Sequence, residues 1–303
     1  MNETDRRRYQ KIIGEGNWLV QTTHPTLATA TSILAGFCKA PPQTAIPVMQ
    51  HYLRYFQHAK DYALLNSLDN KDGLEVESDS DWAGLYSAIG EVRSRTGSLI
   101  KLDGMPVAWR SSYQKCVGTS MNPEMEINYE HDNLDDYEIA TASAEAELYA
   151  ICTGTSEGLS LLHCLQELRL LKCVKLKVMT DSSAAKSITT RHGPGKQSKH
   201  IQLRFLFVQD LVKSGSTTIK KVPTTGSPTD FLTKYVSKDT MHHRLTTLGV
   251  DTDIQTDFRN YVSQISSSTT SRMTFGVQTK ISGIQNYVQE TNPKSYTISL
   301  IKC

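Results

Sequence analysis

The chain has 303 residues, of which 38% are hydrophobic, and a formal net charge of only +2. This length allows roughly one to three domains, and the near-neutral charge excludes a global electrostatic field that draws in nucleic acid. No stretch approaches the ~20 uninterrupted apolar residues of a membrane-spanning helix, so we expect no membrane partner.

The cysteines and the N-terminal residues indicate an intracellular protein. The six cysteines show neither a Cys-x-x-Cys pair nor the spacing of a zinc site. Residues 1–5 are polar and no apolar run follows them, so we expect no signal peptide. We therefore expect free thiols in a reducing compartment.

Changes in composition divide the chain into three regions. Residues 1–66 are predicted to be helical, with a break at Ala40-Pro41-Pro42, and residues 67–71 form a polar linker. Strand and helix patterns alternate over residues 72–250, which predicts an α/β domain. Residues 251–303 are rich in Ser, Thr and Gln, and we expect this tail to be poorly ordered.

The α/β region starts with three strands, predicted near 74–80, 97–102 and 106–113, which would form an antiparallel meander. A long helix is predicted over 143–171 from apolar residues spaced three and four apart. The remaining elements are expected at 174–180 (parallel strand), 182–190 (helix), 198–213 (helix), 216–222 (strand) and 228–236 (helix). Residues 119–138 carry seven acidic residues and no lysine or arginine, which predicts a solvated insertion loop.

Four carboxylates follow one another along this pattern, each in a setting that would direct it at one point. Asp79 and Asp181 end predicted strands, Glu147 lies early in the long helix, and Asp230 opens the last helix. Clustered carboxylates repel one another and are costly to desolvate, so folds tolerate them mainly where cations neutralise them. A pair of Mg²⁺ ions about 3.5–4 Å apart is a common centre for cutting phosphodiesters. The alternative for each residue alone is a helix cap or a surface charge.

The surroundings of these carboxylates resemble the ribonuclease H domain of Ty1/copia-type retrotransposon Pol polyproteins. Seven phrases match in family order, at residues 78–84, 95–98, 106–111, 142–148, 180–182, 198–204 and 230–234. Upstream, residues 18–65 are similar to the stretch that links the polymerase to this domain, most clearly at residues 49–56.

This resemblance implies an α/β ribonuclease H-like fold, a mixed five-stranded sheet with helices on both faces, preceded by a small helical connection region. It implies a metal-dependent endonuclease that hydrolyses the RNA strand of RNA–DNA hybrids. Two Mg²⁺ ions, or Mn²⁺, would be held by Asp79, Glu147, Asp181 and Asp230, with Asp79 bridging both. The polymerase part of the same Pol polyprotein is a further expected partner, in a cytoplasmic particle or the nucleus.

Other polar residues have two interpretations each. Arg191, Lys196, Lys199 and Arg204 either contact phosphates or form a solvated helix face. His200 matches a family histidine and either relays protons or caps and packs a helix. Asp81 and Glu145 lie two residues from proposed ligands, and we leave both out of the ligand set.

Several departures from the family keep a second function open. No polymerase metal site is recognisable, Glu77 stands where an aromatic residue is usual, and Thr229 replaces a small alanine. The alternative is a catalytically impaired or domesticated remnant that binds nucleic acid without efficient cleavage. The order Asp, Glu, Asp, Asp argues against integrases, in which the glutamate comes last.

Overall fold

The computed structural model describes residues 1–59, 62–64, 73–82, 84, 93–118, 138–140, 143–170, 175–193, 205–224 and 227–251. The predicted linker 67–71, the tail beyond residue 251, and the acidic insertion apart from its last residue lie outside this part of the chain. None of the helices in the described part is both long and apolar enough to cross a membrane.

A mixed sheet of six strands forms the centre of the molecule, in the order β5-β4-β3-β2-β6-β7. Its members are β2 (Leu74–Asp81), β3 (Arg93–Leu102), β4 (Met105–Gly118), β5 (Glu138–Ala140), β6 (Leu176–Thr180) and β7 (Thr217–Lys221). β2, β3 and β4 form the predicted antiparallel meander, whereas β6 runs parallel to both β2 and β7. The predicted ribonuclease H-like fold is confirmed, and the three-residue β5 adds a parallel edge strand to the five that the sequence predicts.

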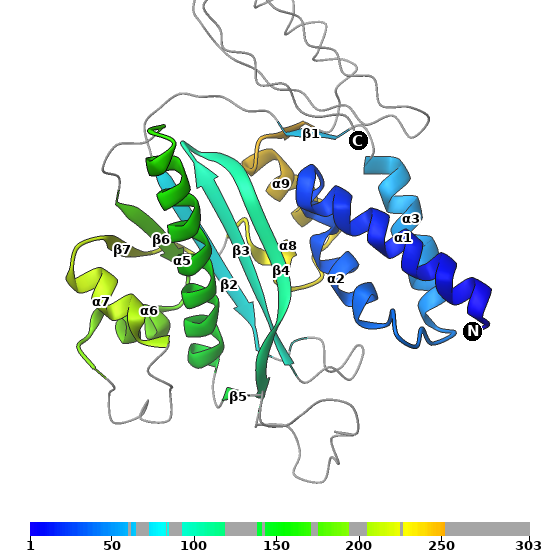
Figure 1. The fold of residues 1–303 in the computed structure, drawn as a ribbon, viewed down its shortest axis with the longest axis horizontal. Helices are drawn as coiled ribbons and strands as arrows, with labels where there is room; N and C mark the ends of the chain where they lie inside the picture. The colour runs from blue at the N-terminus through cyan, green and yellow to red at the C-terminus, as the bar shows by residue number, and fades with distance from the viewer. Residues whose placement is uncertain are drawn as a thin grey trace, which may run out of the picture.

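One face of the sheet is covered by α5 (Ser143–Glu167), α6 (Ser183–Thr190) and α7 (Phe207–Lys213), as Figure 1 shows. Alternation along β2 and β6 sends Val76 and Leu176 to this face, where both are fully buried. Gly158 allows α5 to approach closely, because a Cβ at this position would lie 2.5 Å from Val76 Cγ2. The contact fixes the distance between α5 and the strand that carries Asp79.

The opposite face is covered by the N-terminal helices together with two late ones (Figure 1). These are α1 (Glu3–Thr22), the 3-10 helix η1 (Pro25–Leu27), α2 (Ala28–Gly36), α3 (Ala45–Ala59), α8 (Asp230–Thr233) and α9 (Lys238–Thr247). Leu34 and Tyr52 share one hydrophobic core with Leu99 of β3 and Phe231 of α8. Residues 1–59 are therefore mainly helical, as predicted, and complete the second face of the sheet. Residues 63–64, which the prediction included in a helical region 1–66, instead form a strand that pairs with residues 250–251. The division into domains stays a prediction.

Polar contacts also join the N-terminal helices to the rest of the molecule. Thr29 Oγ1 donates to the Phe231 carbonyl at 2.6 Å, and Trp109 Nε1 donates to the Val20 carbonyl at 2.6 Å. Downstream of α3, β1 (Ala63–Leu64) pairs antiparallel with β8 (Val250–Asp251) in a two-stranded sheet. Segments almost two hundred residues apart are thus held side by side.

The last predicted helices differ from the observed ones. The helix predicted at 228–236 ends at Thr233, because the Lys234 backbone is extended, with φ −139° and ψ 166°. A separate helix, α9, then begins after Ser237, whose side chain accepts a hydrogen bond from the Thr240 amide. The helix predicted at 198–213 is observed from Phe207 onward, and its residues 198–204 lie outside the described part.

Candidate metal centre

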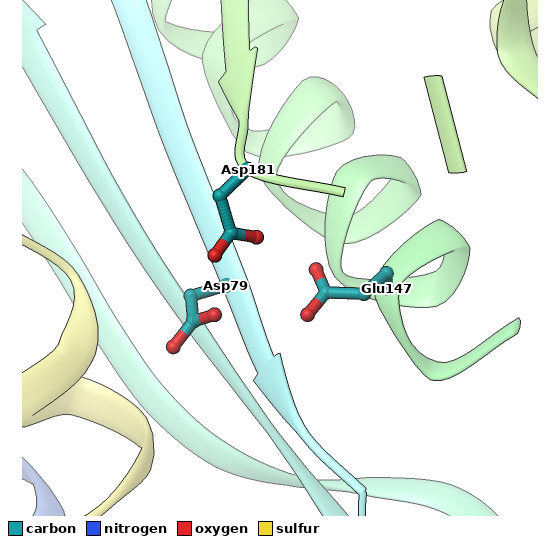
Figure 2. A group of neighbouring side chains, drawn as sticks. All are labelled: Asp79, Glu147 and Asp181. Carbon is teal, nitrogen blue, oxygen red and sulfur yellow. The ribbon is translucent and has the colours of Figure 1, made fainter. Parts of the chain in front are cut away.

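Three of the four predicted carboxylates meet at one edge of the sheet. One oxygen from each of Asp79, Glu147 and Asp181 lies within 4.8 Å of the others. Figure 2 shows them gathered between β2, the end of β6 and the first turns of α5. Oxygen ligands in such a group suit Mg²⁺ or Mn²⁺.

Local structure explains why these side chains meet. Asp79 lies near the end of β2, and Asp181 directly follows β6, the parallel neighbour of β2, so both lie at the same edge of the sheet. After Asp181 the chain turns into α6, where Ser182 Oγ accepts a hydrogen bond from the Ala185 amide at 3.1 Å. Glu147 is held against β2 by the Ser80 amide, which donates to its Oε1 at 3.3 Å.

The electrostatics of this group show that a cation would fit it. Burial, followed by the charges of Asp79 and Asp181, raises the pKa of Glu147 to about 9. Burial also raises the pKa of Asp79, although a hydrogen bond from Thr233 works in the opposite direction. The Glu147 Oε2 atom is buried and has no hydrogen-bond partner among the described residues. A divalent cation would relieve both the repulsion and the missing partner.

Asp230 lies at the margin of this group rather than within it. Its carboxylate accepts from Arg244 Nη2 at 2.9 Å and forms an ion pair with Lys234 Nζ at 2.7 Å. Its charge still contributes to the raised pKa of Asp79. Because Thr233 of the same helix donates to Asp79 Oδ2 at 2.5 Å, α8 packs directly against the site. A role for Asp230 as a fourth ligand stays a prediction.

Gly97 allows this approach of α8. It pairs with Asp79 across the β2–β3 ladder, and a Cβ at Gly97 would lie 2.8 Å from both Leu232 Cβ and Thr233 Cγ2. Since real Cβ atoms hardly ever come so close, only glycine leaves room for α8 here. The position of Thr233 against Asp79 therefore depends on a glycine, which has no side chain, at position 97 of β3.

The two acidic residues left out of the ligand set have other partners. Asp81 Oδ1 accepts from the Arg95 amide at 2.6 Å, and burial raises the pKa of Asp81 to about 6 despite this bond. Glu145 is buried and accepts from the Tyr149 hydroxyl at 2.5 Å. Neither belongs to the convergent carboxylate group.

The predicted nucleic-acid contacts lie mostly beyond the described residues. Arg191 directly follows α6 and is partly exposed. Lys196, Lys199, Arg204 and His200 lie outside the described part. Their roles in phosphate contact and in proton transfer stay predictions.

Sequence reasoning assigned no role to three residues that the structure places at the site. Thr233 and Lys234 belong to the matching phrase 230–234, and the spacing of Asp230 and Lys234, four apart, was a signal for an ion pair. Arg244 gave no such signal, because its contact with Asp230 depends on the packing of α9.

Lys234 pairs with Asp230 at the margin of the site, where the neighbouring carboxylates favour its charged form. Burial disfavours the charged form of Lys234, but its hydrogen bond to Asp230 and the charges of Asp79, Asp230 and Asp181 together raise its pKa. Its side chain is 49% exposed, whereas that of Arg244 is only 8% exposed. Lys234 is therefore the more exposed of the two cations that pair with Asp230.

The sheet order, the helices on both faces and the acidic group at the strand ends define a ribonuclease H-like fold with a candidate metal centre. The chain is a relative of the retrovirus-related Pol polyproteins of copia-type transposons, as its motifs indicated. No protein-family model matches the chain.

Three relatives illustrate the extent of the similarity. The Pol polyprotein from transposon RE1 of Arabidopsis thaliana is 24% identical over 247 residues, 82% of this chain and 15% of that protein. The Pol polyprotein from transposon TNT 1-94 of Nicotiana tabacum is 26% identical over 231 residues, 76% of this chain and 15% of that protein. Secreted RxLR effector protein 161 of Plasmopara viticola is 35% identical over 112 residues, 37% of this chain and 77% of that protein. The chain thus spans about 15% of the length of its Pol relatives.

Proposed function

We propose that this chain is a metal-dependent endonuclease of a retrotransposon Pol region that hydrolyses the RNA strand of RNA–DNA hybrids. The observation that carries the proposal is the convergence of Asp79, Glu147 and Asp181, with ligand atoms within 4.8 Å of one another on a ribonuclease H-like sheet. The buried, unpartnered Glu147 Oε2 supports it, because such an atom is costly unless a ligand binds there.

The proposed ligands are Asp79, Glu147 and Asp181, with Asp230 as a further one. When bound, two divalent ions (Mg²⁺ or Mn²⁺) would lower the pKa of the attacking water and neutralise charge on the leaving oxygen. Groups of the protein itself hold the proposed ligands in place. Thr233 holds Asp79 Oδ2, and the Ser80 amide orients Glu147. Burial and the neighbouring carboxylates raise the pKa of Glu147 to about 9, so Glu147 would have to lose a proton to hold a cation at neutral pH.

The resemblance to the ribonuclease H domain of copia-type Pol polyproteins supports an RNA–DNA hybrid as the proposed substrate. A protein can select the RNA strand by contacts to its 2′-hydroxyls across the shallow minor groove. Arg191, Lys196, Lys199 and Arg204 would contact phosphates of the substrate. These contacts supply affinity that weakens with salt and carries no base preference. The polymerase part of the same Pol polyprotein is the proposed protein partner.

The test is cleavage of an end-labelled RNA–DNA hybrid by the purified chain, beside the same RNA alone and duplex DNA. We expect cleavage of the hybrid RNA with Mg²⁺ or Mn²⁺ and none with EDTA. Asp181→Asn should abolish cleavage, and Asp239→Asn, an exposed acidic residue on α9, should leave it unchanged.

Two results would contradict the proposal. Equal cleavage of duplex DNA and hybrid would mean that the chain does not select RNA. Hybrid binding in a gel-shift assay without any cleavage would instead support the alternative of a catalytically impaired remnant.

A further inference from the structure

One buried glutamine of β4 connects three strands of the sheet to the start of α5. Gln114 is only 7% exposed. Its amide nitrogen donates to the Ala146 carbonyl at 2.8 Å, to Thr96 Oγ1 at 2.9 Å and to Ser80 Oγ at 3.2 Å. Because a backbone carbonyl can only accept, the amide nitrogen of Gln114 must be the group that faces Ala146. A single side chain of β4 thus contacts β3, β2 and α5.

Two of these three partners hold Glu147, one of the three convergent carboxylates. Ala146 directly precedes Glu147 near the start of α5. The backbone amide of Ser80 donates to Glu147 Oε1 at 3.3 Å, while the hydroxyl of Ser80 accepts from Gln114. These contacts close a ring that runs from Gln114 through Ala146 and Glu147 to Ser80 and back. The ring fixes both the backbone and the carboxylate of Glu147, which points toward β2 in Figure 2.

The ladder between β3 and β4 becomes irregular at this glutamine. Arg95 pairs with Tyr113, whereas Arg93 pairs with Val117, so two steps along β3 match four steps along β4. Gln114 directly follows Tyr113, where the regular pairing ends. Bulges redirect side chains and are frequent beside active sites. The irregularity therefore begins at the residue that reaches α5.

The amide oxygen of Gln114 indicates that packing alone does not favour a glutamine here. Gln114 Oε1 is buried and has no hydrogen-bond partner among the described residues. A buried polar atom without a partner costs stability, and an apolar side chain of similar length would avoid this cost. The contacts of the amide nitrogen are therefore what a glutamine supplies at this position.

We propose that Gln114 is a positioning residue, which holds Glu147 toward Asp79 and Asp181 and thereby sets the affinity of the three carboxylates for a divalent cation. The inference rests on the proposed metal-dependent function. Gln114 acts through Glu147 and not as a ligand. Residues that orient metal ligands in this way change metal affinity about 10–100-fold when they are replaced.

The test replaces Gln114 by methionine, which keeps the length of the side chain and removes the amide. Gln209→Met is the matched control, because Gln209 of α7 is also 7% exposed and donates to the Ile188 carbonyl of α6 at 2.7 Å. Mg²⁺ and Mn²⁺ affinities are measured by isothermal titration calorimetry. Urea unfolding in EDTA measures stability, and cleavage of a labelled hybrid in saturating Mg²⁺ gives kcat and KM.

We expect Gln114→Met to bind Mg²⁺ about 10–100-fold more weakly than the wild type. Its kcat should fall, because Glu147 would be displaced, whereas KM for the hybrid should stay unchanged, because a buried side chain does not touch the substrate. Gln209→Met should lose stability but keep the metal affinity and the kcat of the wild type. Equal weakening of metal binding in both variants would assign the effect to lost stability and overturn the proposal.

A second variant tests the ring of contacts. Ser80→Ala removes the hydroxyl that accepts from Gln114 and keeps the backbone amide that binds Glu147. If Gln114 and Ser80 act through one ring, the double variant should weaken Mg²⁺ binding by less than the product of the two single effects. Effects that multiply would contradict the ring.

The failures of the two proposals are distinguishable. A wild-type chain that binds neither Mg²⁺ nor Mn²⁺ would overturn the metal-dependent function and this inference together. A wild-type chain that binds metal, beside a Gln114→Met chain with equal affinity, would overturn only the role of Gln114. If Gln114→Met does not fold, Gln114→Asn, whose side chain is one methylene shorter, is measured in the same way. Wild-type affinity in that variant would overturn the role of Gln114, and weaker affinity would support it.

Discussion

Replacing Gly97 by alanine should move α8 away from the cluster of Asp79, Glu147 and Asp181. The new Cβ would lie 2.8 Å from Leu232 Cβ and Thr233 Cγ2, and 3.3 Å from the Thr229 carbonyl oxygen. Non-bonded carbons settle at about 3.5–4.0 Å. The shortfall is 3.5 − 2.8 to 4.0 − 2.8, so α8 or β3 must shift by roughly 0.7–1.2 Å.

Two effects follow from a shift of this size. Overpacking of this kind costs about 1–3 kcal/mol of unfolding free energy. The Thr233 hydroxyl, 2.5 Å from Asp79 Oδ2, would also lose its hydrogen bond to a charged acceptor. Because a misplacement of about 1 Å can lower a catalytic rate about 100-fold, we expect hybrid cleavage by Gly97→Ala to fall by about that factor.

Urea unfolding and single-turnover cleavage of a labelled hybrid measure the two effects separately. Gly14→Ala is the matched control, because a Cβ at this exposed helical position would meet nothing within 4 Å. It should stabilise the protein by about 0.5–1 kcal/mol and leave cleavage unchanged. If Gly97→Ala unfolds and cleaves like the wild type, the contact between β3 and α8 does not position the site.

Three further predictions concern charge, metal and packing. In EDTA, the pKa of Glu147 is raised from 4.5 to about 9 in the folded state. Between these two pH values the folded state holds a proton that the unfolded state has lost, so the free energy of unfolding should fall as pH rises. Urea unfolding should show a smaller decline between pH 7 and 9 for Glu147→Gln than for the wild type. Mg²⁺ at 100 times its dissociation constant should stabilise the wild type by about 2.7 kcal/mol in thermal melts, and Asp181→Asn should lose most of this gain. Thr29→Val removes the 2.6 Å hydrogen bond to the buried Phe231 carbonyl and should lower the free energy of unfolding by about 1–3 kcal/mol. The control Thr22→Val, at an exposed position, should change the free energy of unfolding by less than about 0.5 kcal/mol. Equal effects of the two threonine variants would contradict a special role for the α2–α8 contact.

Local pattern explains much of the fold. The alternation from Leu74 to Ser78 predicted β2, and spacings of three and four predicted α5, because both elements bury one face of a regular repeat. The meeting of Asp79 with Asp181 also followed from sequence, since the ends of neighbouring parallel strands lie at one edge of a sheet.

Long-range packing explains what the sequence did not reveal. The end of α8 at Thr233 follows no breaker residue, and its closeness to the sheet depends on Gly97, far away in the chain. The pairing of Arg244 with Asp230 likewise needs the position of α9. Such contacts leave no periodic signal, because each depends on how separate elements come together.

The largest gap concerns the first region of the chain. Its helical content was predicted, but the shared core of Leu34 and Tyr52 with Phe231 was not. Arg95, fully buried on β3, donates to Ser32 on α2 at 2.8 Å, a contact that no local pattern specifies. An apolar stripe shows that a helix must pack against another element, but it does not identify that element.

The pairing of β1 with β8 has a consequence for how this sequence can change over generations. Helix α8 rests on α2 through Thr29, and the strand pair joins residues 63–64 to residues 250–251. If recombination replaced only the segments that carry Asp79, Glu147 and Asp181, the new sheet would meet N-terminal helices that had not evolved together with it. The N-terminal helices and the segment from α8 to β8 are therefore expected to be inherited as one unit, and a copy that loses the former loses the support of its α8 as well.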